Sequence, residues 1–313
     1  MQSYCDILEN GNLVAIPTET VYGLGADATN ANAVAKIYRL KQRPDFNPLI
    51  VHCHSIAQIE TFAEFNPIAY KLAIKFWPGA LTLVLPLQPN HKIAKAVTAG
   101  LTTIAVRIPN HPRTLNLLKR FNKPIAAPSA NISGKISPTN PNHVKNAFQG
   151  NCPAILDGGS CTIGLESTII GFNHQQQPVL LRAGGIPLES LEYNIGTIHY
   201  NQDTDITAPG QLSSHYAPNS PVILNSLNPA HQDGFLAFGN DIPKTAKTVY
   251  QLSKKQDLFE AAANLFDGLH FLDTQNIQQI HVAPIPNISI GHAIIDRLTR
   301  AATEKNNQRS HDI

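Results

Sequence analysis

The sequence predicts an α/β protein with a mixed sheet in its N-terminal part and a second, smaller α/β unit behind it. Short apolar runs alternate with amphipathic stretches along the chain, which is the pattern of strands and covering helices. A length of 313 residues fits about two domains, and a hydrophobic fraction of 42% suffices for a sizeable core. This periodicity fails from about Glu192 to Pro221, where Pro, Ser and Gly accumulate.

In the N-terminal part, apolar runs predict strands and amphipathic runs predict helices. We expect strands at 13–16, 49–52, 81–86, 104–108 and 125–127, and helices at 32–40, 56–65, 68–76 and 111–120. Further strands are expected near Ile155, Ile169 and Leu181. Polar groups at the ends of several of these strands suggest one shared crevice at an edge of the sheet.

The C-terminal part repeats the alternation on a smaller scale. We expect strands at 222–224, 234–238, 248–252 and 279–282, and helices at 257–272 and 291–303. The chain is therefore divided into domains 1–195 and 221–313, joined by a linker at 196–220. That linker is too long for an ordinary connection, and His215-Tyr216 in its middle suggests a further role.

Composition excludes several classes of protein. A formal net charge of +2 selects no polyanionic partner. The cysteines are scattered without CxxC spacing, which argues against a zinc ribbon, a thioredoxin-like motif or a disulfide scaffold. No apolar run approaches the roughly 18 residues of a membrane span, and the N-terminus lacks the features of a signal peptide. We expect a cytoplasmic protein without membrane contact.

The segment Pro17–Gly25, PTETVYGLG, is the first candidate for a site. Hydroxyl and carboxylate side chains crowd its positions from Thr18 to Tyr22, and the glycines that follow can take positive φ or admit a ligand. An ordinary loop between a strand and a helix is the alternative. Polarity at this density at a strand end favours a binding site.

Three cations, Arg39, Lys41 and Arg43, end the first predicted helix. Cations in a last helical turn complement the helix dipole, which is one explanation for them. A proline-rich irregular loop then leads to a strand that ends in His52. A cationic cluster displayed on a loop beside Pro17–Gly25 would suit an anionic ligand such as a polyphosphate.

Arg107 lies in an otherwise apolar strand, TIAVRIP. An unpaired cation is costly there, so the side chain requires a buried carboxylate partner or an anionic ligand, and both alternatives stay open. The segment 126–139, AAPSANISGKISPT, has the composition of a phosphate-cradling loop but contains no Walker motif. A flexible Ser/Asn loop explains that composition almost as well.

Several motifs follow one another along the chain: PTETVYGLG, KQRP, FWPGALTLVL, TIAVRIP, APSANISG, LESTII and LLRAGG. In this order they resemble the YrdC/Sua5 family, the L-threonylcarbamoyladenylate synthases, over about residues 5–190. The linker with HYAP and the C-terminal unit resemble the Sua5 domain. The resemblance implies a twisted mixed sheet around a concave cavity and a small Rossmann-like C-terminal domain.

Enzymes of this family condense L-threonine, bicarbonate and ATP into threonylcarbamoyl-AMP and pyrophosphate, ahead of the t6A modification of tRNA. The resemblance implies Mg²⁺ that accompanies ATP, without a metal site made of protein side chains. It also implies a downstream tRNA threonylcarbamoyl-transfer machinery as partner and leaves room for an RNA contact.

The resemblance assigns site residues by their position in the motifs. The threonine-binding positions are Thr20, His52, Arg107, Ala127, Ser167 and Thr168. The catalytic constellation is Lys41, Arg43, Ser129 and Asn131. The ATP-contacting positions are Arg43, Asn47, Thr103, Ser129, Ser137, Arg182 and Tyr216.

The linker departs from the family's PGMKYRHYAP-like pattern. It reads PGQLSSHYAP, with Gln211, Ser213 and Ser214 at the positions of a methionine and two basic residues, so its closing role is left open. Two rival functions are a non-catalytic module that binds double-stranded RNA or tRNA, and a carbamoyl-transfer enzyme sharing the domain. The complete set of motif residues favours the synthase, and the extra modules of the carbamoyl-transfer relatives are absent from the sequence.

Overall fold

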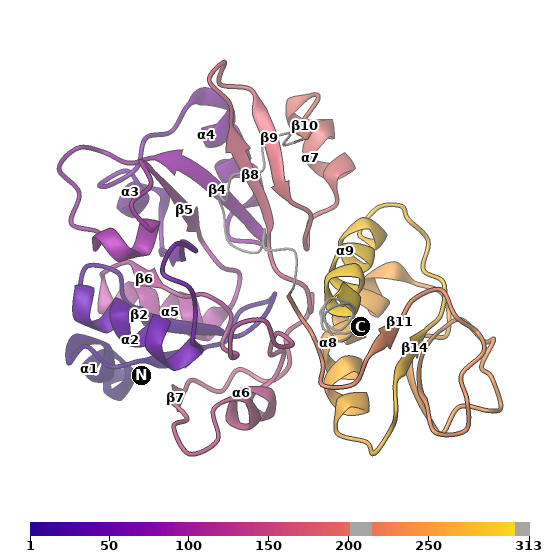
Figure 1. The fold of residues 1–313 in the computed structure, drawn as a ribbon. Coiled ribbons are helices and arrows are strands. Elements are labelled where there is room, and N and C mark those ends of the chain that lie inside the picture. The colour runs from indigo at the N-terminus through magenta and orange to yellow at the C-terminus, as the bar shows by residue number, and fades with distance from the viewer. Residues whose placement is uncertain (201–214, 304–313) are drawn as a thin grey trace, which may run out of the picture.

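The computed structural model describes residues 1–200 and 215–303, which form two α/β domains side by side (Figure 1). The predicted fold class is confirmed, because these residues build a 10-stranded mixed sheet and a separate 4-stranded sheet. The divergent linker residues Gln211, Ser213 and Ser214 lie outside the described ranges. The domain boundaries expected at 195 and 220 stay predictions.

The larger sheet mixes parallel and antiparallel neighbours. Its strands are β1 (Val14–Ile16), β2 (Gly23–Asp27), β3 (Ile50–His52), β4 (Leu81–Pro86), β5 (Thr103–Arg107), β6 (Ile125–Ala126), β7 (Ala154–Ile155), β8 (Thr168–Phe172), β9 (Pro178–Arg182) and β10 (His199–Tyr200). They lie in the order β10-β9-β8-β4-β5-β3-β6-β2-β1-β7. Parallel pairing of β3 with β5 places His52 opposite Arg107, so two predicted site residues end neighbouring strands at one edge.

Helices cover this sheet and begin at recognisable caps. They are α1 (Gln2–Glu9), α2 (Ala31–Lys41), α3 (Ile56–Ile59), α4 (Pro67–Phe76), α5 (Pro112–Phe121), α6 (Pro141–Ala147) and α7 (Leu188–Ile195). Side chains of Asn30, Asn66 and Asn140 accept backbone N–H bonds and start α2, α4 and α6. Within the described residues, no helix has the length and hydropathy needed to cross a bilayer.

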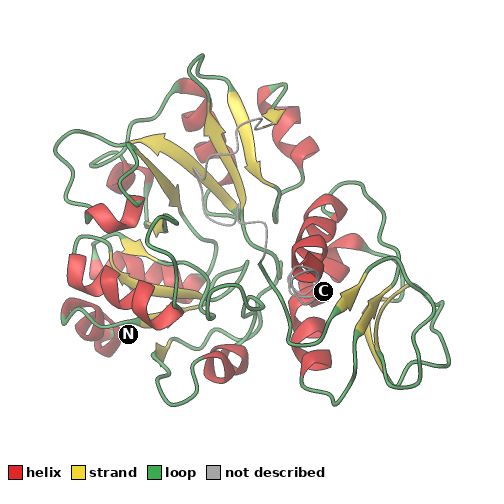
Figure 2. Cartoon of the chain, viewed as in Figure 1, coloured by secondary structure: helices red, strands yellow, loops and turns green. Residues whose placement is uncertain are grey.

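The smaller domain is built on a parallel sheet. Its elements are β11 (Val222–Ile223), β12 (Gly234–Phe238), β13 (Thr248–Ser253), α8 (Leu258–Asp273), β14 (Ile280–Val282) and α9 (Gly291–Ala302). The strands lie in the order β11-β14-β12-β13, and neighbouring strands are parallel. Both helices stand between this sheet and the larger domain, so they form the side that meets it (Figures 1 and 2).

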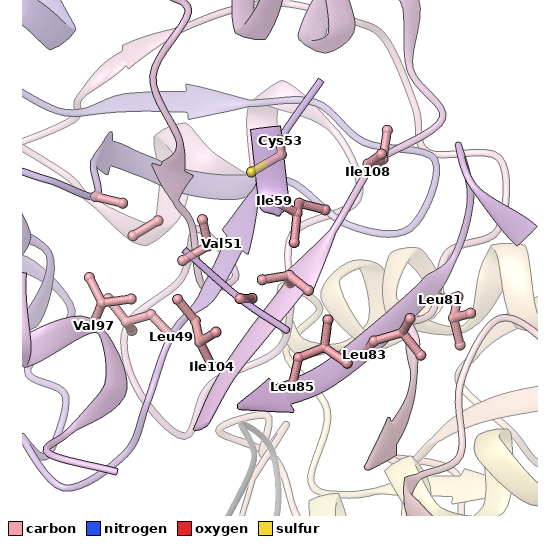
Figure 3. Packing of buried hydrophobic residues seen from close by; sticks show 14 of the residues in the cluster. Leu49, Val51, Cys53, Ile59, Leu81, Leu83, Leu85, Val97, Ile104 and Ile108 are labelled. Carbon is pink, nitrogen blue, oxygen red and sulfur yellow. The ribbon is translucent and has the colours of Figure 1, made fainter. Parts of the chain in front are cut away.

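The main hydrophobic core lies on one face of the larger sheet. Alternate residues of β4, Leu81, Leu83 and Leu85, all contribute to it, because successive side chains of a strand point to opposite faces. Figure 3 shows them together with Val51 and Ile104 from the neighbouring strands β3 and β5. The core thereby fixes the strands whose ends carry the polar residues discussed below.

A second hydrophobic cluster joins the two domains. It combines Val21, Ile136, Leu165 and Tyr216 with the buried faces of α8 and α9. This cluster forms the seam between the domains, and a polar contact extends it. Nε2 of His270 in α8 lies 3.1 Å from the carbonyl oxygen of Ser137. The smaller domain therefore packs directly on loops that carry predicted site residues.

The sequence predicted that Pro17–Gly25 is a loop leading into a helix, and this prediction is wrong from Gly23 onward. Gly23 begins β2, which pairs antiparallel with β1, so the polar segment is the turn of a hairpin. Neither glycine takes a positive φ. A Cβ at Gly25 would lie 3.0 Å from Ile125 Cγ2, and one at Gly23 would lie 3.1 Å from Ala127 Cβ, so both glycines permit close packing of strands.

The helix predicted at 56–65 ends at Ile59. The backbone of Ala63 instead pairs with Leu87, and Glu64 N–H donates to the Pro86 carbonyl at 2.9 Å, which draws this segment onto the end of β4. The short elements α1, α6, α7 and β10 were not predicted. Each is brief or rich in polar residues, so its periodicity is weak.

We predict that Gly164→Ala destabilises the seam between the domains. Gly164 has a φ of +73°, and an added Cβ would lie 2.5 Å from the Ala263 carbonyl oxygen in α8. Left-handed strain and overpacking together should lower the free energy of unfolding by about 3 kcal/mol. Urea unfolding followed by circular dichroism measures this loss.

Gly150→Ala is the matched control, because Gly150 has a φ of +80° but nothing within 4 Å of an added Cβ. It should lower the free energy of unfolding by only about 1 kcal/mol, from backbone strain alone. Equal losses in the two variants would contradict the close approach of α8.

Candidate active site

Eight parts of the chain surround one pocket. They are the β1–β2 hairpin, the ends of β3, β5 and β9, the segment before β8, the loops after α2 and β6, and the described linker residues. The predicted site residues that line it are Thr20, Arg43, His52, Arg107, Ala127, Ser129, Ser167, Arg182 and Tyr216. The crevice predicted at the ends of the strands is therefore present.

The structure places other predicted site residues behind the pocket wall, namely Lys41, Asn47, Asn131, Ser137 and Thr168. Each of them has a side-chain atom that bonds within the wall. Thr168 Oγ1, for example, donates to the Ile186 carbonyl at 2.7 Å. Thr103 begins β5, at the opposite end of the strand from Arg107, so it is not brought to the pocket.

Arg107 organises one end of the pocket. Its guanidinium donates from Nε to the Gly79 carbonyl at 3.0 Å and from Nη1 to the Thr20 hydroxyl at 2.8 Å, and Nη2 lies 2.7 Å from Glu19 Oε1. The predicted buried carboxylate partner is thus Glu19. Since a guanidinium has five N–H donors and Arg107 lines the pocket, the ion pair leaves it able to bind an anion.

The hairpin turn fixes the position of Thr20. Thr18 Oγ1 donates to the Val21 carbonyl at 2.6 Å and accepts the backbone N–H groups of Thr20 and Val21. The hydroxyl groups of Thr18 and Thr20 lie 2.7 Å apart. This local network explains why threonines occupy the turn, because their side chains replace backbone partners that a hairpin lacks there.

His52 faces Arg107 across the pocket edge and is 3% exposed. Burial and the positive charge of Arg107 lower the pKa of His52 to about 3, so the imidazole is neutral at pH 7. Among the described residues its Nδ1 has no hydrogen-bond partner, although it is buried. A neutral ring with an unpaired nitrogen can accept or donate one hydrogen bond to a ligand, depending on its tautomer.

The cations at the end of α2 do not form the displayed cluster that the sequence suggested. Arg39 is exposed, whereas Lys41 is 1% exposed. Lys41 Nζ donates to the carbonyl oxygens of Ser129 and Asn131, each at 2.6 Å. Burial, followed by the charge of Arg43, lowers the pKa of Lys41. Lys41 therefore ties the end of α2 to the loop after β6.

Arg43 projects into the pocket from a fixed setting. Its Nη2 donates to Asn47 Oδ1 at 2.5 Å and to the Pro48 carbonyl at 2.8 Å, and its Nε donates to the Asn47 carbonyl at 3.1 Å. Burial lowers the pKa of Arg43 to about 10, so the guanidinium stays charged at neutral pH. Asn47 thus orients a cation that lines the pocket.

Arg182 is the third buried arginine of the pocket. Its Nε and Nη2 both donate to the Ser167 carbonyl, at 3.1 and 2.9 Å, and Nη2 also lies 3.2 Å from the Ser167 hydroxyl. That hydroxyl lies 2.7 Å from Thr82 Oγ1. Burial lowers the pKa of Arg182 to about 10, which still leaves it cationic at neutral pH.

Glu166 is the carboxylate of this end of the pocket. It accepts the Ser137 hydroxyl at 2.6 Å and the Nε of Arg297, from α9, at 2.8 Å. Burial alone would raise the pKa of Glu166, but the charges of Arg297 and Arg182 outweigh it and lower the pKa to about 2. Ser137 is therefore held by a carboxylate rather than aimed at the pocket.

The described end of the linker closes the pocket. His215 and Tyr216 both line it, and Tyr216 has a φ of +68°, which is uncommon for a bulky residue. The ring of Tyr216 stacks on Phe266 of α8, with centroids 5.4 Å apart. Burial lowers the pKa of His215 to about 3. His215-Tyr216 thus does more than connect the domains, as the sequence suggested.

Sequence reasoning did not assign Glu19, Glu166 or Arg297 to the site. Glu19 lay within the first candidate segment, and the burial of Arg107 required either a carboxylate partner or an anionic ligand. Arg297 lies between Ile295 and Leu298 in the helix expected at 291–303. An arginine beside the apolar face of a helix indicates that a buried carboxylate pairs with it. This was the signal in the sequence for the contact of Arg297.

The fold and this pocket define a two-domain α/β protein with a buried, arginine-rich cleft, and known families match both domains. The family model Sua5_yciO_yrdC, described as Telomere recombination, matches residues 6–184. Residues 186–303 match Sua5_C, described as Threonylcarbamoyl-AMP synthase, C-terminal domain. The chain belongs to the Sua5/YciO/YrdC family.

Relatives with both domains cover nearly the whole chain. Threonylcarbamoyl-AMP synthases of Bacillus subtilis and Pyrococcus abyssi are 41% and 40% identical, covering 95% and 94% of this chain and 91% and 92% of theirs. A crystal structure of P. abyssi Sua5 complexed with L-threonine superposes with a TM-score of 0.88 at 39% identity, covering 96% of this chain and 93% of that one. The family resemblance seen in the sequence is confirmed.

We predict that Glu166 makes stability depend on pH below about 4.5. Its pKa is about 2 in the folded protein against a reference of 4.5, so its contribution is complete above pH 4.5 and is lost as the pH falls toward 2. Glu166→Gln should remove about 3 kcal/mol from the total change in unfolding free energy across this window. Urea midpoints measured from pH 6 to pH 3 test the slope.

Glu64→Gln, at an exposed glutamate, is the control and should leave the slope as in the unmodified protein. A Glu166→Gln variant whose midpoints fall as steeply with acid as those of the unmodified protein would rule out the depressed pKa.

Proposed function

We propose that this chain is a threonylcarbamoyl-AMP synthase, which condenses L-threonine, bicarbonate and ATP into threonylcarbamoyl-AMP and pyrophosphate. The observation that carries the proposal is a single pocket in which Arg107 bonds Thr20, while Arg43 and Arg182 both interact electrostatically with Tyr216 of the linker. Relatives along the whole chain bear this enzyme name, and one solved relative is complexed with L-threonine.

Threonine is proposed to bind at the Arg107 end. A carboxylate fits the remaining guanidinium donors of Arg107, whose orientation Glu19 and Gly79 fix. Thr20 and neutral His52 offer hydrogen-bonding groups without adding charge. Ala127 lines the pocket and leaves room for a small side chain, while Ser167 and Thr168 support the opposite wall.

ATP is proposed to bind toward the linker. Arg43 and Arg182 are charged, buried and oriented, so they suit phosphate oxygens, and Ser129 lines the pocket beside them. Tyr216 lines the pocket at the same end. Contacts of ATP with Asn47, Thr103 or Ser137 stay predictions, as do direct roles of Lys41 and Asn131, because their side chains lie outside the pocket lining.

The chemistry needs positioning and neutralisation of charge. The amine of threonine attacks CO₂ or an activated bicarbonate to form a carbamate, whose oxygen attacks the α-phosphorus of ATP while pyrophosphate leaves. Buried arginines fixed in advance stabilise the charge that develops on the phosphates, and a shared pocket brings the carbamate in line with them. No step requires a covalent nucleophile on the protein.

Mg²⁺ is proposed to enter with ATP. The described residues contain no cluster of three or more His, Cys, Asp or Glu side chains that could hold a metal ion. The carboxylates of Glu19 and Glu166 are already engaged, by an ion pair with Arg107 and a bond from Asn110 N–H for Glu19, and by Ser137 and Arg297 for Glu166. When bound, the ion would neutralise phosphate charge, with phosphate oxygens as its natural ligands.

The product would supply the tRNA threonylcarbamoyl-transfer machinery, and an RNA contact and a cytoplasmic location belong to the same proposal. The competing function is a double-stranded RNA or tRNA-binding module without catalysis. A module that only binds a nucleic acid backbone has no need of Arg107, Thr20 and neutral His52 around a buried pocket. Their arrangement favours the enzyme.

We predict that the purified protein, given Mg²⁺, ATP and bicarbonate, releases pyrophosphate only when L-threonine is present. The physical reason is that the attacking oxygen belongs to the carbamate of threonine. A coupled pyrophosphate assay with and without threonine is the measurement, and serine and D-threonine serve as controls. Release that ignores threonine would refute the proposed function.

We predict that conservative changes separate the two substrates. Arg107→Lys keeps the positive charge beside Glu19 but loses the paired N–H donors with which a guanidinium binds a carboxylate. The KM for threonine should therefore rise by about tenfold, and the KM for ATP should change little. Arg43→Lys should show the reverse pattern. Steady-state kinetics with each substrate varied in turn give the four constants.

Arg39→Lys, at an exposed cation of α2 shortly before Arg43, should leave both KM values unaltered. If Arg107→Lys and Arg43→Lys each weakened both substrates equally, the two-ended pocket would be wrong.

A further inference from the structure

Arg297 of α9 reaches from the smaller domain into the wall of the pocket. It is 0% exposed and is among the largest fully buried side chains of the described residues. Its Nε donates to Glu166 Oε2 at 2.8 Å, its Nη2 donates to the Ala183 carbonyl at 2.9 Å, and its Nη1 donates to Asp296 at 2.5 Å. All three nitrogens of the guanidinium are therefore held in place.

The carboxylate that Arg297 holds is part of the pocket lining. Glu166 also accepts the hydroxyl of Ser137 and faces the charge of Arg182. Without a cationic partner, the carboxylate of Glu166 would repel a polyphosphate. It would also draw Arg182 away from that ligand. The second positive partner, Arg297, balances Glu166 from behind the wall.

Arg297 also supports the linker residue that closes the pocket. Its guanidinium carbon lies 5.2 Å from the centroid of the Tyr216 ring. The same ring stacks on Phe266 of α8. Tyr216 has a φ of +68°, and a bulky residue keeps that conformation only where its surroundings determine it. Those surroundings are supplied by α8 and α9.

We propose that Arg297 is a positioning residue for the nucleotide end of the pocket, through which the smaller domain fixes Glu166 and Tyr216. The proposal rests on the proposed function for the identity of the nucleotide and goes beyond it by giving the smaller domain a part in the site. Arg297 itself does not line the pocket, so it acts through these two residues.

The position has a direct energetic consequence. Removing Arg297 would leave Glu166 buried with an uncompensated charge, which is strongly unfavourable. Glu166 would then turn toward Arg182, the remaining cation that it faces, and Tyr216 would lose the contact on its ring. Both changes fall on the ATP end and leave the Arg107 end intact.

The test compares Arg297→Met, Arg297→Met with Glu166→Gln, and Arg300→Met in the full chain. Isothermal titration calorimetry gives the Kd for ATP with Mg²⁺ and, separately, for L-threonine, and thermal melting gives the Tm. Arg297→Met should raise the Kd for ATP by about tenfold or more and leave the Kd for threonine unchanged. The reason is that the unpaired carboxylate of Glu166 weakens binding only of the ligand beside it.

The double variant removes the charge that Arg297 compensates. It should regain most of the lost ATP affinity and most of the lost Tm, because a neutral amide can still bond the Ser137 hydroxyl. Arg300→Met alters the next turn of α9, where the side chain contacts Asp296 rather than Glu166, and should leave both Kd values unchanged.

Three results would overturn the proposal. They are an Arg297→Met variant that binds ATP as well as the unmodified protein, equal losses of ATP and threonine affinity, and a double variant with a restored Tm but no gain in ATP affinity. If the single variant fails to fold, a folded double variant that binds ATP about tenfold or more weakly than the unmodified protein would also overturn it. An unmodified protein that binds both ligands without releasing pyrophosphate would refute the proposed function and leave this test intact.

Discussion

The burial of positive charge around one pocket is the constraint on which the rest of the structure depends. Arg43, Arg107 and Arg182 are each at least nine-tenths buried, and each needs partners that replace water. Carbonyl oxygens supply most of them, and Glu19 and Glu166 supply the negative charge. Strand ends, the hairpin turn and the linker converge because they provide these partners.

The sequence predicted much of this arrangement and missed the part that depends on distant pairing. Apolar runs located β4 and β12 to the residue, since a buried strand is visible in composition alone. Burial of Arg107 implied a carboxylate partner or an anionic ligand, but identifying Glu19 as the partner requires knowing how the hairpin folds. Arg297 and Glu166 are 131 residues apart, and no local sequence pattern predicts a contact over that separation.

Errors also arose where one residue type serves several purposes. Glycines in PTETVYGLG were assigned to backbone freedom, yet Gly25 serves to let β2 approach Ile125. Cations at the end of α2 were expected on a displayed loop, whereas Lys41 turns inward to carbonyl oxygens. In both cases the local sequence is compatible with either outcome, and only the neighbouring strands and loops decide between them.

The two bonds from Lys41 to the loop after β6 have a consequence for motion. They join the C-terminal end of α2 to Ser129 and Asn131, so this loop cannot swing outward without carrying the helix with it. Helix and loop form one rigid wall. An opening on this side of the pocket would therefore have to move α2 and the loop together.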